Sequence, residues 1–596
     1  MCGLSFDFSR IGERIQNKSI GLVSHRGPDN TKVIEFENGI CNISFCRLAI
    51  RELIEGNQPL VLDGFISCFN GELYNQEEIE DRIRELDAKI FIPRGDMNVL
   101  ALYLFLTEGR GITNVVGMFA GFIYFAKTSM IKLFRDRTGE KPIFYSITDE
   151  RISVLSENRF RDYQNDKCEP IELTYSELFQ GFLGTNVNDK TKSCPTGSIV
   201  SISLKSGNSV VEKYWHWPQR EFSSKSISLS DFEVLLENVV ESQLVSDVPV
   251  AVLLSSGIDS SVIASIAKRK LVSGLSAFTL GFEDNGWDES NGAKRVADYL
   301  DIDHRVVRYS YEELADLVPS VLKSMDVPIF DPATISMYAL CKAVSKSHRV
   351  AIGGDGGDEL FRGYDLIANE KILEWLRKFP IARSIPNNLT HLLMELPTGS
   401  YNSRRMKLMR GLSVLQNTDI TLPLIALSPF AGTRLTDKIK DRISARQSID
   451  LDISAERYYQ EKILPSVYLI KSDRMSMAHS LELRSPLLDH RLIEVSMQLA
   501  SKTIQGFGRK GLLSEIAKNR FPNEILQRRK HGFSPPFSQI IQYLPEQDWE
   551  PQLLNIFGSD LQVTWEKAKF NQNHAFAAWA LLVCNYFIAN RNLKLI

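Results

Sequence analysis

Residues 248–254 form a nearly continuous apolar run, and this run limits the possible folds of the chain more than any other segment. Such a run predicts a strand covered on both faces, as in parallel sheets. Further elements are predicted to alternate after it: helices at 260–270, 292–300 and 338–347, and strands at 275–281, 305–309 and 349–352. This alternation predicts an α/β doubly wound parallel sheet. From about residue 365 onward the pattern is mostly helical.

The first part of the chain, residues 1 to about 205, has a different pattern. Short β-favouring runs bounded by turn residues predict strands at 20–24, 40–48, 65–70, 119–125, 131–135 and 152–155. Helical spacing of apolar residues predicts helices at 75–86 and 97–108. These elements indicate a layered α+β domain. Turn residues and a Ser/Lys-rich stretch predict a linker at 206–228, so that a second domain would cover 229–596.

The composition excludes several classes of protein. A chain of 596 residues is too long for one core, and 43% hydrophobic with 24% charged residues is typical of globular proteins. A net charge of -3 gives no electrostatic attraction to nucleic acid or to an anionic membrane. The longest apolar stretch, 575–588, is shorter than the roughly 18 residues of a membrane span and predicts a buried helix instead. The eight cysteines have no zinc or redox spacing, and we expect reduced thiols in the cytoplasm.

Two loops of small residues follow the predicted strands 248–254 and 349–352. The first is Ser255-Ser256-Gly257-Ile258-Asp259-Ser260-Ser261, and the second is Gly353-Gly354-Asp355-Gly356-Gly357-Asp358-Glu359. Small residues before a helix favour binding of phosphate, and ligands of open α/β sheets bind at the carboxyl ends of strands. Asp259 and Asp358 would then hold Mg²⁺ on a pyrophosphate group. The alternatives are a plain strand–helix connection with an N-cap and an acidic surface loop. The loops lack the Gly-Lys-Ser/Thr of kinases and GTPases.

Cys2 is a candidate nucleophile because of its position. If Met1 is removed, Cys2 carries a thiol and an α-amine on one residue. An α-amine has a pKa of about 8 and would accept the thiol proton, which produces the attacking thiolate. Taken alone, Cys2 is better explained as an incidental cysteine near a chain end, and the rest of the chain has to support the catalytic interpretation.

Together these features resemble the glutamine-dependent asparagine synthetases, and the loop at 255–261 resembles the PP-loop of N-type ATP pyrophosphatases. The resemblance covers nearly the whole chain. It rests on an ordered set of motifs: Cys2-Gly3, His25-Arg26-Gly27-Pro28-Asp29, Arg47-Leu48, Asn70-Gly71-Glu72, Gly95-Asp96, Gly117-Met118-Phe119-Ala120, Arg135-Asp136-Arg137, Lys141-Pro142, Ser156-Glu157, the two loops above, Asp473-Arg474-Met475-Ser476-Met477-Ala478 and Arg484-Ser485-Pro486.

For residues 1–205 the resemblance implies an N-terminal-nucleophile glutaminase with αββα layers. Cys2 would attack glutamine, and the Asn70 amide with the Gly71 N–H would stabilise the oxyanion. The resemblance places the glutamine carboxylate at Arg47, beside Leu48, since a guanidinium suits a carboxylate. It assigns the α-amine to Glu72 and Asp96. We expect His25 to be a structural loop residue.

For the second domain the resemblance implies ATP-dependent activation of a carboxylate as an acyl-AMP, which ammonia attacks after passing through an internal tunnel. It implies residues for each part of ATP: Leu254 and Leu280 beside adenine; Ser255, Ser256, Gly257, Asp259, Ser260, Ser261 and Gly354 around the phosphates; and Lys510, with Lys471 and Arg474 as further candidates, facing phosphate charge. Asp355 would lie near the acceptor. The implied cofactors are ATP as a substrate and Mg²⁺ at Asp259 and Asp358.

The sequence departs from the family in ways that bear on the acceptor. Ser256 and Gly353 replace residues of similar size, but Pro332 stands where shorter asparagine synthetases have an arginine that helps hold aspartate. Aspartate is the expected acceptor, and a sugar uronic acid of polysaccharide biosynthesis is the alternative. Amide formation within a peptide or β-lactam is less favoured, because such relatives often lose the nucleophile. A non-catalytic binder would be expected to lack Cys2, Arg47, Asp259 or Asp358, and a simple amidohydrolase would need no PP-loop. A homodimer is expected from the resemblance.

Overall fold

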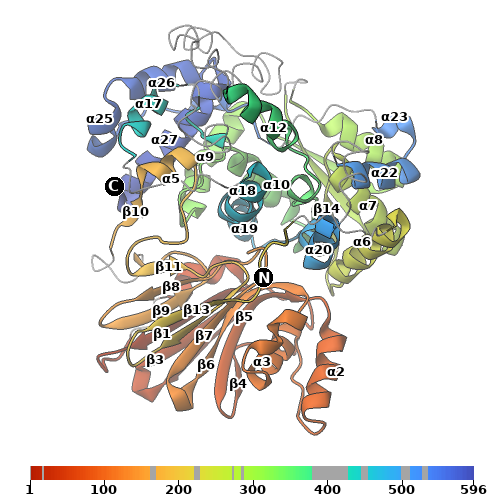
Figure 1. Ribbon diagram of the computed structural model, residues 1–596, viewed down its shortest axis with the longest axis vertical. Coiled ribbons are helices and arrows are strands. Elements are labelled where there is room, and N and C mark those ends of the chain that lie inside the picture. The colour runs from red at the N-terminus through yellow and green to blue at the C-terminus, as the bar shows by residue number, and fades with distance from the viewer. Residues whose placement is uncertain are drawn as a thin grey trace.

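The computed structural model describes residues 2–15, 19–161, 169–219, 228–271, 274–283, 287–378, 427–431, 433–443, 454–498, 510–526 and 534–596. Figure 1 shows a β-sandwich with a larger body of helices above it, and the N-terminus lies between the two. The two-domain organisation predicted from the sequence is therefore confirmed, and the first residues of the chain lie at the domain interface.

Two antiparallel six-stranded sheets form the sandwich. The order of the first is β11 (Thr191–Ser193), β8 (Phe144–Ile147), β9 (Arg151–Leu155), β1 (Gly3–Ser9), β3 (Cys41–Arg47) and β2 (Asn30–Phe36). The order of the second is β13 (Ser209–Lys213), β12 (Ser198–Ser203), β7 (Met130–Arg135), β6 (Gly117–Phe125), β5 (Phe65–Leu73) and β4 (Leu60–Leu62). Alternate residues such as Leu4 and Phe6 of β1 point inward and meet Phe122 and Tyr124 of β6.

Helices cover the outer faces of the sandwich unequally. The predicted helices are present as α2 (Gln76–Leu86) and α3 (Asp96–Leu106), whose apolar residues pack on the second sheet.

The prediction of a strand at 20–24 is wrong, because this segment forms the short helix α1 (Ile20–Val23) on β1 and β3. Gly3 allows the contact, since a Cβ there would lie 2.4 Å from the Val23 carbonyl oxygen. Packing of the buried Val23 thus overrides the β-propensity of the segment.

The sheet of the second domain is parallel throughout. Its order is β16 (Asp303–Arg308), β15 (Ser276–Gly281), β14 (Val250–Leu253), β17 (Val350–Ile352) and β18 (Glu482–Arg484). The connecting helices are α7 (Ile258–Lys270), α8 (Ser290–Leu300), α9 (Tyr311–Ser324) and α10 (Ala333–Val344), and α6 (Leu229–Leu244) precedes β14. Since the chain continues from β14 first to one side and later to the other, the strand order reverses between β14 and β17.

Helices make up most of the described residues that follow β17. They are α11 (Gly357–Leu360), α12 (Asp365–Arg377), α17 (Leu435–Lys440), α18 (Ala455–Tyr458), a π-helix (Tyr459–Tyr468), α19 (Leu469–Met477), α20 (His490–Gln498), α22 (Gly511–Arg520), α23 (Asn523–Leu526), α24 (Phe537–Ile540), α25 (Pro551–Phe557), α26 (Asp560–Ala568) and α27 (Gln572–Arg591). The apolar stretch 575–588 lies in α27, which is buried as predicted. Within the described residues, no helix is both long and apolar enough to cross a membrane.

The predicted linker does not begin at residue 206. Residues 209–213 form β13, which pairs with β12 in the sandwich. The turn residues that suggested a linker instead close this hairpin: Ser203 N donates to the Asn208 carbonyl, and Gly207 has a φ of +76°. A turn between two paired strands and a turn at a domain boundary share the same residue types, so composition alone does not separate them.

A segment of the first part of the chain packs in the second domain. Strand β10 (Ile171–Leu173) pairs in parallel with β19 (Leu593–Leu595), and α5 (Tyr175–Gln180) follows it. Phe179 and Phe182 belong to the same hydrophobic cluster as Trp579 of α27. Figure 1 shows β10 and α5 beside α27, away from the sandwich. Residues near 170–183 therefore attach the first part of the chain to the C-terminal helices.

We expect the contact between β10 and β19 to contribute measurably to stability. Leu595→Ala removes a buried side chain and should cost about 2 kcal/mol or more, which lowers Tm by several degrees. Lys594→Ala, at an exposed position of the same strand, should leave Tm nearly unchanged. Thermal melting of both variants tests this, and equal Tm values would contradict it.

Candidate active sites

The first candidate site surrounds Cys2 at the start of β1. The Cys2 nitrogen donates to Asn70 Oδ1 at 2.7 Å, which fixes the Asn70 amide. The Asn70 Nδ2 group is buried and has no hydrogen-bond partner among the described residues. An unused buried donor is costly unless a ligand accepts from it, so Asn70 suits a developing oxyanion. Gly71 has a φ of +142°, and a Cβ there would lie 2.0 Å from the Met118 carbonyl oxygen, so only glycine fits.

Arg47 lies in the wall of the same cavity, and the structure gives it a second task. Its two terminal nitrogens donate to the carbonyl oxygens of Arg51, Glu52 and Leu53 and to Asn57 Oδ1, at 2.7–3.1 Å. Arg47 therefore organises the loop 51–57 that forms one side of the cavity. The predicted neighbour Leu48 is buried and lines the same cavity as Cys2.

The two predicted acceptors of the substrate amine lie together. Nη1 of Arg51 is 3.4 Å from Glu72 Oε2 and 3.5 Å from Asp96 Oδ2, and Arg484 of the second domain is 3.3 Å from Glu72 Oε1. Sequence reasoning missed Arg51, although it follows the Arg47-Leu48 motif closely. Its guanidinium shows that this corner of the cavity accepts a cation between two carboxylates.

Burial controls the protonation of this site. It raises the pKa of the Cys2 thiol, so a base is needed to form the thiolate. It also raises the pKa of Glu72 to about 8, where Arg484 opposes the rise and Glu482 adds to it. Cys2, Arg47, Leu48, Gly71, Glu72 and Asp96 line one cavity, with Arg51, Gln58 and Asn98 among the other lining residues. The structure thus brings the predicted glutaminase residues together around one small space.

The second candidate site lies where the strand order of the parallel sheet reverses. The loops that follow β14 and β17 touch there: a Cβ on Gly354 would lie 2.9 Å from the Ser260 nitrogen, and one on Gly357 would lie 2.7 Å from Asp259 Cγ. Both glycines are therefore needed for the close approach of the two loops. This is the position at which open α/β sheets bind ligands.

A lysine joins the acidic residues of the two loops. Nζ of Lys510, at the start of α22, is 2.6 Å from Asp358 Oδ1 and also contacts Asp259. Two carboxylates that reach one ammonium nitrogen also have the spacing to share one metal ion. Mg²⁺ binds by one or two carboxylates together with phosphate oxygens, so Asp259 and Asp358 fit such an ion. Lys510 would then be released to face phosphate.

The predicted phosphate loop is held by its own serine hydroxyls. Ser255 N donates to Ser260 Oγ and Gly257 N donates to Ser255 Oγ, each at 3.1 Å. Ser256 N donates to Glu289. Ser261 Oγ donates to the carbonyl of Gly257, the loop residue that caps α7, at 2.8 Å. Leu254 and Leu280 are both buried at the ends of adjacent strands.

Helix α19 borders this site and carries two of the predicted residues, Lys471 and Arg474. Ser472 Oγ donates to Asp355 Oδ2 at 3.1 Å, and Lys471 pairs with Asp331 at 2.7 Å. Burial raises the pKa of Asp355, while the Lys471 charge opposes the rise. The prediction that Arg474 faces phosphate is wrong. Arg474 is buried at the domain interface, where its guanidinium donates hydrogen bonds to Asp326 and Asp473.

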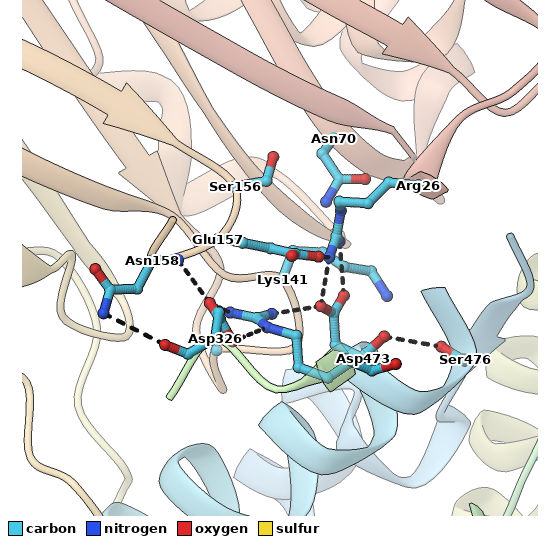
Figure 2. Close-up of polar contacts among 12 residues, drawn as sticks. Arg26, Asn70, Lys141, Ser156, Glu157, Asn158, Asp326, Asp473 and Ser476 are labelled. Carbon is cyan, nitrogen blue, oxygen red and sulfur yellow. Dashed lines mark hydrogen bonds and ion pairs between the residues drawn. The ribbon is translucent and has the colours of Figure 1, made fainter. Parts of the chain in front are cut away.

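Charged residues of both domains meet at this interface, as Figure 2 shows. Arg26 of the sandwich donates to both oxygens of Asp473 on α19 and to Glu157 Oε1, at 2.8–2.9 Å. His25 pairs with Glu157 at 2.9 Å, in keeping with its predicted structural role. The cluster lies between the two candidate sites.

The fold and the two sites define a two-domain amidotransferase in which an N-terminal-nucleophile domain is joined to a nucleotide-binding α/β domain. The chain belongs to the asparagine synthase family: the sequence pattern of that family matches residues 231–572, and that of the glutamine amidotransferase domain matches residues 1–215.

Three relatives illustrate the range of similar proteins. Asparagine synthetase [glutamine-hydrolyzing] 1 of Bacillus subtilis is 29% identical over 86% of this chain and 83% of its own. Asparagine synthetase [glutamine-hydrolyzing] 3 of the same organism is 24% identical over 95% of each chain. Amidase chyE of Penicillium rubens is 25% identical over 90% of this chain and 89% of its own.

The pKa of Glu72 predicts how glutamine binding depends on pH. Only ionised Glu72 attracts the α-ammonium group, and with a pKa of about 8 its ionised fraction rises as the pH increases from 6.5 to 8.5. KM for glutamine should therefore fall several-fold over this range in glutaminase assays. In Glu72→Gln the change should be small. The same pH dependence in both proteins would show that Glu72 does not bind the amine.

Proposed function

We propose that this protein transfers the amide nitrogen of glutamine to an ATP-activated carboxylate, with aspartate as the acceptor and asparagine, AMP and pyrophosphate as products. The proposal rests above all on the Asn70 side chain, which holds the Cys2 nitrogen through Oδ1 and leaves a buried Nδ2 donor for an oxyanion. Membership of the asparagine synthase family supports the overall reaction.

In the first half-reaction, with Met1 removed, the Cys2 amine takes the proton of the Cys2 thiol. The thiolate attacks the glutamine amide carbon, and the resulting oxyanion accepts from Asn70 Nδ2 and the Gly71 N–H. Collapse of this intermediate returns the proton to the leaving ammonia, and water then releases glutamate from the thioester. The raised pKa of the buried thiol supports the need for this internal base.

In the second half-reaction the acceptor carboxylate attacks the α-phosphorus of ATP and releases pyrophosphate. We propose that Ser255, Ser256, Gly257, Ser260, Ser261 and Gly354 surround the phosphates and that Leu254 and Leu280 border adenine. Mg²⁺ would be held by Asp259 and Asp358, and it would neutralise phosphate charge together with Lys510. Ammonia then attacks the acyl-AMP and expels AMP. We propose that Asp355 takes the proton that ammonia loses, and the rise of its pKa on burial supports this role.

One observation favours a second acceptor. Pro332 is the N-cap of α10, and a proline side chain offers no charge to an aspartate carboxylate. Lys471 offers a positive charge at this site, but it pairs with Asp331 at 2.7 Å. A sugar uronic acid is therefore the second candidate. A cytoplasmic location, which rests on the cysteine pattern, and a homodimer, which rests on the family resemblance, are further proposals.

Purified full-length protein with glutamine, Mg·ATP and aspartate tests the proposal. We expect glutamate, AMP, pyrophosphate and asparagine to form together. Cys2→Ala should release no glutamate from glutamine but should still make asparagine from ammonium salts. Glutaminase activity that survives in Cys2→Ala would refute the nucleophile. If glucuronate stimulates pyrophosphate release and aspartate does not, the acceptor is a uronic acid and not aspartate.

A further inference from the structure

The buried charges at the domain interface include one contact with the nucleophile itself. Nε of Arg26 donates to the Cys2 carbonyl oxygen at 3.2 Å, while its terminal nitrogens donate to Asp473 and Glu157. Arg26 is fully buried. A planar guanidinium with fixed partners on both terminal nitrogens has little freedom to turn, so its Nε–H points in a set direction. The direction of this donor is set mainly by Asp473, which accepts from both terminal nitrogens.

Asp473 is itself held in place from the second domain. Nη1 of Arg474 donates to Asp473 Oδ2 at 2.6 Å, and Nε and Nη2 of Arg474 donate to the two oxygens of Asp326 at 2.5 and 2.7 Å. Although burial opposes ionisation, the charges of Arg26 and Arg474 lower the pKa of Asp473. Asp473 is therefore a carboxylate at neutral pH and remains a strong acceptor for Arg26.

Cys2 depends on these contacts because it lies just before β1, which begins at Gly3. The sandwich fixes its nitrogen through Asn70 at 2.7 Å, and Arg26 fixes its carbonyl oxygen. Holding both ends of the Cys2 main chain fixes the Cα–Cβ bond from which the thiol projects. A displacement of about 1 Å in such a group can reduce the rate of a reaction about 100-fold.

The helix that carries Asp473 also reaches the second site. Lys471 and Ser472 of α19 contact Asp331 and Asp355, and they directly precede Asp473, which contacts the sandwich. Figure 2 shows Asp473 on α19 facing Arg26 across the interface. A single turn of this helix therefore touches both the proposed acceptor site and the support of Cys2.

We propose that Asp473 of the second domain is a positioning residue for glutamine hydrolysis: it orients Arg26, and Arg26 orients the main chain of Cys2. Glutaminase activity then requires the second domain to be docked in the arrangement that can receive ammonia. This inference rests on the proposed role of Cys2 as the nucleophile.

The test uses Asp473→Asn in the full-length enzyme. Asparagine keeps the shape but loses the charge and one of the two acceptor oxygens, while Glu157 still pairs with the Arg26 guanidinium. We expect the glutaminase kcat to fall about 10- to 100-fold and KM for glutamine to stay within about twofold. Asp473→Glu, which restores the charge, should recover part of the loss. Addition of Mg·ATP should still raise the Tm of Asp473→Asn. This rise would show that the second domain of the variant is folded.

Asp326→Asn is the matched control. Asp326 is equally buried and accepts from two nitrogens of Arg474, but it does not touch Arg26. A merely structural cluster would make the two Asn variants equivalent, whereas positioning predicts a clearly larger kcat loss for Asp473→Asn, because Asp326 reaches Arg26 only through Arg474 and Asp473. Equal losses in both variants, or an unchanged kcat in Asp473→Asn, would overturn the proposal. Glutaminase activity in Cys2→Ala would instead refute the nucleophile, so the two failures are distinguishable.

Discussion

The ion pair between Arg26 and Asp473 is the interaction on which the relation of the two domains depends. It buries two charges that share two hydrogen bonds, and each charge has a further opposite partner, Glu157 for Arg26 and Arg474 for Asp473. Removing such charges from water is costly, and the cost is offset only if the geometry is well satisfied. A buried pair of this kind therefore favours one docking arrangement over others, in addition to the apolar contacts of the segment that contains β10 and α5.

This arrangement explains how two reactions with opposite needs share one chain. Glutamine hydrolysis needs a thiol held rigidly beside an oxyanion donor, which Asn70 and Arg26 provide at the edge of the sandwich. Activation of a carboxylate needs converging loops and a cation, which the reversal of strand order between β14 and β17 supplies. Because α19 contacts both regions, the two candidate sites belong to one docked assembly.

The sequence allowed much of this to be predicted, but only where local signals decide the structure. The apolar run at 248–254 and the small-residue loops were sufficient to predict the parallel sheet and its ligand edge, and the alternating runs predicted most of the sandwich. The errors share a cause: α1 exists because Val23 packs on Gly3, and β13 exists because β12 lies beside it. Arg51 and Arg474 were missed or misassigned because their partners, Glu72, Asp96, Asp326 and Asp473, are mostly distant in sequence. Tertiary contacts of this kind leave no periodic signal.

The central claim is that Asp473 acts on Cys2 only through Arg26, and a double-mutant cycle on the glutaminase kcat tests it most directly. Arg26→Gln, Asp473→Asn and the double variant are compared with the unaltered protein. The account predicts that Asp473→Asn slows the unaltered protein but has no further effect once Arg26 is glutamine. If the two losses multiply instead, Asp473 acts by another route, and the proposed connection from the second domain to the nucleophile is contradicted.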